Sequence, residues 1–170
     1  TGKVFDLGSF EWKNIADVQA ARRSPIAYWT GTKVLVWGGM SAGSPISDGV
    51  LYDPTADKWA FTNTINAPTA RSGVGAAWSG TELLLFGGRP GGIGTTNDGY
   101  AYNPITTTWR KFSTSGAPSP RFDTFASWTG SRLLVFGGRD SGGAFFSDAE
   151  LYDPVADTWS SAQTNPLGKR

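Results

Sequence analysis

The chain has 170 residues, enough for one domain of ordinary size, and 39% of them are hydrophobic, with eight tryptophans available for a core. Its 15 basic residues nearly balance 14 acidic ones, so the net charge gives no reason to expect nucleic acid or an anionic membrane surface as a partner. The absence of cysteine and histidine excludes disulfides, most hydrolase triads and nearly all zinc or copper centres. We therefore expect no metal and no cofactor.

The longest apolar runs have four or five residues. A helix that spans a bilayer needs ~20. We therefore expect no membrane insertion.

One stretch of eleven residues occurs three times with nearly the same letters. The copies begin at Trp29, Trp78 and Trp128 and end on two glycines, so the period is 49 and then 50 residues. Periods of this length are typical of solenoids, propellers and other arrays. We divide the chain into an opening segment and three full repeats, at 1–21, 22–70, 71–120 and 121–170.

The opening segment resembles the end of a repeat. Asp6 is followed six residues later by Trp12, and the same spacing separates Asp53 from Trp59. We predict that this segment supplies one outer strand of a repeat whose beginning is missing.

Each full repeat begins with two strand-like pieces joined by a tight turn. The first piece runs from an arginine to the tryptophan seven residues later, and a Thr-Gly or Ser-Gly pair follows it. Glycine adopts a positive φ at no steric cost, so this pair predicts a hairpin. The second piece is a continuous apolar run, which is typical of a strand covered on both faces. These runs occupy residues 34–37, 83–86 and 133–136.

Two more strand-like pieces complete each repeat, after a connection rich in glycine and serine that differs between repeats. The connections span 40–47, 89–97 and 139–147. The third pieces open at Asp48, Asp98 and Asp148 and end in a Tyr-Asp-Pro or Tyr-Asn-Pro turn. The fourth pieces are centred on Trp59, Trp109 and Trp159. Four short strands every ~50 residues, without a helical pattern, predict the blades of a β-propeller.

These features resemble the kelch repeat, in which a double glycine follows an apolar strand and a tryptophan lies six residues after the Asp or Asn of a Tyr-Asp-Pro-like turn. The resemblance covers almost the whole chain. It implies an all-β fold of kelch-type propeller blades, each a four-stranded antiparallel sheet, with 1–21 as the outer strand of an incomplete blade. Propellers usually have about four to eight blades. We therefore expect either a segment of a larger propeller or copies that associate to complete a ring.

In a four-stranded blade, the link between repeats and the loop after the second strand emerge on the same face. Arginines occur at both places, and guanidinium groups suit carboxylates, phosphates or sugar hydroxyls. We predict a basic arc that binds a ligand, with apolar contacts from one loop tip. The predicted ligand-binding residues are Arg22, Arg71, Arg89, Arg121, Arg139, Phe145 and Phe146.

Part of this set has a structural alternative. Arg22, Arg71 and Arg121 recur in every repeat, so they also suit a role in holding the links through backbone carbonyls or the recurring aspartates. Phe145 and Phe146 either meet a ligand or fold down on the blade. For the recurring aspartates we favour capping of the glycine-rich loop or pairing with arginine over metal binding, because equivalent residues of a ring usually lie too far apart to share one ion.

The tryptophans at the ends of the first pieces suggest either a sugar-stacking platform or packing between blades. Their place at a strand end before a tight turn favours packing. The same holds for the tryptophans of the fourth pieces. Asp140 and Glu150 offer a carboxylate pair, but nothing in their spacing separates them from solvated surface, so we predict no catalytic residue.

The sequence therefore favours a non-catalytic binding module that holds a protein partner, an acidic peptide or a carbohydrate on the arginine-bearing face. The alternatives are the propeller domain of a carbohydrate-active enzyme and a structural repeat segment that assembles with itself. Kelch propellers include adaptor and actin-binding modules, sugar-handling enzymes and exported bacterial proteins. A copper site like that of galactose oxidase needs histidine and cysteine, which this chain lacks. By the same resemblance, we favour an extracellular or periplasmic location.

Overall fold

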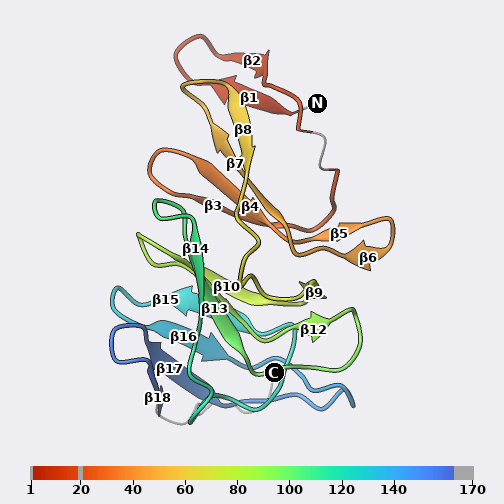
Figure 1. Ribbon diagram of the computed structural model, residues 1–170, viewed down its shortest axis with the longest axis vertical. Coiled ribbons are helices and arrows are strands. Elements are labelled where there is room, and N and C mark those ends of the chain that lie inside the picture. Colours follow the sequence, from red (N-terminus) through yellow and green to blue (C-terminus); the bar gives the residue numbers. More distant parts are fainter. Residues whose placement is uncertain (1, 19–20, 163–170) are drawn as a thin grey trace.

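The computed structural model describes residues 2–18 and 21–162, and these residues contain three four-stranded antiparallel sheets. The described residues contain no helix, which agrees with the all-β prediction, and hence none that could cross a membrane. In each sheet the four strands lie side by side in chain order. The sheets follow one another in sequence order along the long axis of Figure 1, and we name them blades 1, 2 and 3.

The strands lie where the repeat pattern predicts them. Blade 1 contains β3 (Ile26–Trp29), β4 (Val34–Trp37), β7 (Gly49–Asp53) and β8 (Lys58–Phe61). Blade 2 contains β10 (Gly75–Trp78), β11 (Leu83–Phe86), β13 (Gly99–Asn103) and β14 (Thr108–Lys111). Blade 3 contains β15 (Phe125–Trp128), β16 (Leu133–Phe136), β17 (Ala149–Asp153) and β18 (Thr158–Ser161).

The opening segment differs from its prediction. It contains two paired strands, β1 (Lys3–Asp6) and β2 (Glu11–Asn14), so the prediction of one outer strand is wrong. The Asp6 carboxylate accepts hydrogen bonds from the backbone N–H groups of Gly8 and Ser9. Asp53 accepts equivalent bonds at the turn after β7. The hairpin therefore matches the third and fourth strands of a blade.

Glycine is required where the second strand of each blade ends. The second glycine of each pair has a positive φ, and a Cβ there would lie 2.8 or 2.9 Å from a backbone oxygen of the link that enters the same blade. These glycines are Gly39, Gly88 and Gly138. The double glycine therefore lets each link cross close to the end of the second strand.

The core lies between blades. One buried cluster joins blades 1 and 2 and includes Leu35, Trp37 and Leu85, and a second joins blades 2 and 3 and includes Phe86 and Val135. Strand β11 contributes to both clusters, and each of its four side chains is at most 1% exposed. Full burial of a leucine side chain contributes about 1.5–3 kcal/mol. The middle blade is therefore held from both sides.

The outer tryptophans fasten each blade to the segment that leaves the blade before it. The indole N–H of Trp109 donates to the carbonyl of Asn63 at 2.8 Å, and that of Trp159 donates to the carbonyl of Ser113 at 2.9 Å. Trp109 also belongs to the cluster between blades 1 and 2, and Trp159 packs against the one between blades 2 and 3. The prediction that these two tryptophans pack between blades is confirmed.

The first strand of each blade ends in a tryptophan, and the three tryptophans differ in burial. Trp78 and Trp128 pack against the clusters between blades, as predicted, whereas Trp29 is 53% exposed. Trp12 in the opening hairpin is also largely exposed. The prediction that further blades or further copies complete the ring stays a prediction.

Candidate functional site

The two faces of the row of blades carry different connections. Because the strands are antiparallel and lie in chain order, the turns after the first and third strands of every blade share one face. The links between blades share the other face with the longer loops 40–47, 89–97 and 139–147. In Figure 1 the short ladders β5–β6 and β9–β12 mark this second side. We call the two sides the turn face and the loop face.

Arg71 belongs to the link into blade 2 and is buried, with 4% of its surface exposed. It lies on β9 (Arg71–Ser72), which pairs with β12 (Arg89–Pro90). Its guanidinium donates to the carbonyls of Thr69 and Gly87 and to the carboxylate of Asp98. The donors of Arg71 are therefore used to hold the link.

Arg121 holds the link into blade 3 in the same way and has no exposed surface. It donates to the carbonyls of Ser119 and Gly137 at 3.0 Å, and to both oxygens of Asp148 at 2.7 Å. The Phe146 ring lies against it, 4.1 Å from the guanidinium carbon to the ring centroid. Arg121 therefore holds the link and Phe146 folds down on the blade, which are the structural roles that the sequence offered as alternatives to ligand binding.

Arg22 completes the pattern in blade 1. It donates to the carbonyls of Gly38 and Asp48 at 3.0 and 3.2 Å, and its guanidinium lies 3.1 Å from the Asp48 carboxylate. Its side chain is 6% exposed. The predicted pairing of the recurring aspartates with arginine is therefore confirmed in all three blades, and geometry favours a structural role for Arg22, Arg71 and Arg121.

The surroundings of Arg121 change the acidity of two carboxyl groups. Hydrogen bonds from Arg121 lower the pKa of Asp148 against the opposing effect of burial. Burial, reinforced by the negative charge of Asp148, raises the pKa of Glu150 to about 7. The equivalent positions in the other blades are Val50 and Tyr100. Glu150 is therefore an acid at a position where the repeat otherwise uses uncharged side chains.

The loop arginines have a different environment. The guanidinium carbons of Arg89 and Arg139 lie 4.7 and 4.6 Å from the ring centroid of Phe122, which is 7% exposed. Arg139 donates two hydrogen bonds to the Asp123 carboxylate, at 2.8 and 3.2 Å. Within the described part of the chain, Arg89 makes neither a side-chain hydrogen bond nor an ion pair, and its Nε is buried without a partner. Arg89 is therefore a cation held against a ring with its donors unused.

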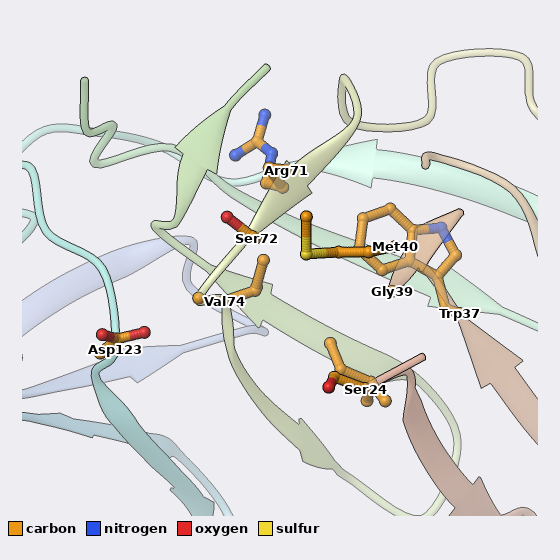
Figure 2. A pocket seen from close by; sticks show the side chains of 10 residues that line it. Ser24, Trp37, Gly39, Met40, Arg71, Ser72, Val74 and Asp123 are labelled. Carbon is orange, nitrogen blue, oxygen red and sulfur yellow. The ribbon is translucent and has the colours of Figure 1, made fainter. Parts of the chain in front are cut away.

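A cavity of about 310 Å³ lies between blade 1 and the link into blade 2, and Arg71 is among the residues that line it (Figure 2). Met40 and Trp37 of blade 1 line one side, and Ser72 and Val74 of the link into blade 2 line another. Asp123, the partner of Arg139, lies at its edge. The cavity combines an apolar wall with hydroxyl and carboxylate groups.

The structure brings together part of the predicted site. Arg89 and Arg139 meet through Phe122, and Phe145 is 53% exposed on a loop whose backbone bridges to Arg139. Phe122 and Asp123 are not among the residues predicted from the sequence. The signal was present, because the two residues that follow each link arginine differ in every repeat, unlike the arginine itself.

The blades and their order define a β-propeller protein with a loop-bearing face. The profile of the KLHDC2/KLHL20/DRC7 Kelch-repeats domain matches residues 26–169, and the chain belongs to this kelch-repeat family. Kelch-repeat domains are in general protein-binding propeller modules. No curated protein matches the chain in sequence.

Proposed function

We propose that this kelch-repeat chain is a non-catalytic module that binds an acidic stretch of a partner protein on its loop face. The environment of Arg89 is the observation on which the proposal rests. It is a guanidinium with unused donors on the loop face, whereas Arg139 already binds Asp123. The planar fork of a guanidinium matches a carboxylate with two parallel hydrogen bonds.

The position of Arg89 supports binding in a second way. Its contact with Phe122 restricts the guanidinium, so less conformational entropy is lost when a carboxylate binds. Arg139 lies against the same ring, where the Asp123 carboxylate offsets its charge and leaves Arg89 as the unpaired cation of the two among the described residues. Phe145, which is exposed on the neighbouring loop, offers an apolar contact to the same ligand.

The cavity extends this surface. Ser72 lines the cavity and its backbone pairs with that of Arg89, so the β9–β12 ladder connects the cavity to the strand that carries this guanidinium. A volume of about 310 Å³ accommodates an apolar side chain next to an acidic residue of the ligand. The apolar wall of Trp37, Met40 and Val74 supports a ligand that alternates acidic and apolar residues.

The test uses a fluorescein-labelled peptide of alternating glutamate and leucine, with binding measured by fluorescence anisotropy. Arg89→Gln should weaken binding about tenfold or more, because a hydrogen bond to a charged group contributes about 1.5–3 kcal/mol. Lys58→Gln removes the same charge at the start of β8, next to the turn face, and should change the affinity less than twofold. Equal binding by Arg89→Gln, or equal binding of a peptide with lysine in place of glutamate, would contradict the proposal.

A further inference from the structure

Two clefts on the turn face are built from equivalent positions of successive blades. The first, of about 390 Å³, lies between blades 1 and 2, and its walls include Thr32, Trp78, Thr81, Pro104 and Ile105. The second, of about 380 Å³, lies between blades 2 and 3, and its walls include Thr81, Trp128, Ser131, Pro154 and Val155. Each wall residue of the second cleft stands 49 or 50 residues after its counterpart in the first. The turn face therefore repeats one cleft.

Each cleft contains a tryptophan whose indole N–H is unused. The N–H groups of Trp109 and Trp159 donate to backbone carbonyls, as described above. Those of Trp78 and Trp128 make no hydrogen bond to any part of the chain that the structure describes, and they are not among its sealed polar groups. A tryptophan N–H that is buried usually has a partner. These two indoles thus offer a ring for packing and a donor for a ligand.

The charged side chains at the cleft walls already have partners. Lys33 of the first cleft pairs with Asp53 at 3.3 Å, and Glu82 of the second pairs with Arg110 at 2.8 Å. An anionic or cationic ligand would have to displace an existing ion pair. The clefts therefore favour a neutral ligand.

Hydroxyl groups supply the remaining polar contacts. Thr32 and Ser131 make no side-chain hydrogen bond within residues 2–18 and 21–162, and Thr81, whose hydroxyl meets only that of Ser79 at 3.3 Å, lines both clefts. The exposed aliphatic chains of Ile105 and Val155 stand at the other side. A purely hydrocarbon ligand would leave the hydroxyls and the indole N–H without partners.

We propose that the turn face binds a neutral oligosaccharide, with one sugar ring against the tryptophan of each cleft. The C–H face of a pyranose packs on an indole ring, and its hydroxyls pair with threonine or serine hydroxyls and the indole N–H. Two equivalent clefts one blade apart suit a chain of repeated sugar units, because linked sites raise the overall affinity above that of either alone. A proline-rich peptide also packs on aromatic rings, but the hydroxyls of each cleft favour a sugar.

The probes are cellohexaose, maltohexaose, xylohexaose and mannohexaose, with decaproline as the peptide comparison, and isothermal titration calorimetry measures binding. At least one hexasaccharide should bind, and Thr81→Val should weaken it about tenfold because Thr81 lines both clefts. Trp78→Phe and Trp128→Phe should each weaken it several-fold, with circular dichroism to verify folding. Thr55→Val is the matched control, since Val155 occupies the equivalent position, and it should leave the affinity within twofold.

Three results would overturn the proposal: no binding of any of the four sugars at 10 mM, binding that Thr81→Val leaves intact, or decaproline binding that Thr81→Val abolishes. Arg89→Gln should leave sugar binding unchanged, so this test and that of the loop face fail independently.

Discussion

Arg121 and Arg89 lie on the same face of the molecule and have opposite surroundings. Arg121 is fully buried, with a carboxylate, two carbonyls and an aromatic ring around it, whereas Arg89 has a ring and no acidic partner among the described residues. Arg121 has a counterpart in every repeat, but the equivalents of Arg89 are Met40 and Arg139. The constant arginines therefore hold the links, whereas the equivalents of Arg89 differ between repeats and have no such structural role in common.

The largest expected effect is on stability. Arg121→Met should lower the free energy of unfolding by about 2–4 kcal/mol, because two carbonyls and the Asp148 carboxylate lose their donor, while water reaches the partly exposed Asp148. Arg89→Met, the matched variant, should cost less than about 1 kcal/mol, the size of a cation–π contact. Urea denaturation followed by circular dichroism measures both. Equal losses of unfolding free energy in the two variants would contradict the distinction between link arginines and loop arginines.

A smaller effect should depend on pH. The pKa of Glu150 is about 7 in the folded chain, against an ordinary value of 4.5, because of burial and the nearby Asp148, with Arg121 acting in the opposite direction. The folded state thus holds the proton more tightly, and this stabilisation is complete below about pH 4.5 and is lost as the pH rises through about 7. Relative to Glu150→Gln, the native chain should lose on the order of 2 kcal/mol between pH 4.5 and 8.

Denaturant titrations of both proteins at several pH values measure this difference. If the difference in unfolding free energy between the native chain and Glu150→Gln stayed constant with pH, Glu150 would titrate as an ordinary surface carboxyl.

The smallest expected effect concerns Arg139. Asp123→Asn removes its ionic partner and keeps the backbone, because asparagine tolerates the positive φ of 53° at this position. Arg139 then joins Arg89 as an unpaired cation at the Phe122 ring. The affinity for the glutamate–leucine peptide should rise about threefold, with a stability loss below about 1 kcal/mol for this exposed pair. Anisotropy titration measures the affinity, and a weaker or unchanged value would argue against a ligand at these arginines.

The sequence predicts the blades well because their signals are local. The apolar runs at 34–37, 83–86 and 133–136 are strands β4, β11 and β16 with the same bounds. The opening hairpin is the exception. Its strands have no continuous apolar run, and Val4, Phe5 and Trp12 are exposed, so only the turn at Asp6 reveals its pairing.

The site is less predictable because its determinants lie far apart in the chain. The burial of Arg121 depends on Asp148, 27 residues away, and the freedom of Arg89 depends on Phe122 and on the absence of a nearby acid in the described chain. The turn-face clefts each combine segments of two blades. A local sequence pattern does not predict contacts between residues that are far apart in the chain. The variation of residues 122 and 123 between repeats was nevertheless a signal for the loop face.

The hydrogen bonds of Trp109 and Trp159 have a consequence for how such chains change in length. Both indoles reach backward by 46 residues, to Asn63 and to Ser113, and these two acceptors are themselves 50 residues apart. Deleting residues 71–120 would bring Trp159 to the acceptor Asn63 in the register that Trp109 uses now. Loss of this whole unit therefore preserves the junction. Trp59 makes the same kind of bond to the carbonyl of Ala16, 43 residues back, so the connections inside a unit can differ in length while the bond is kept.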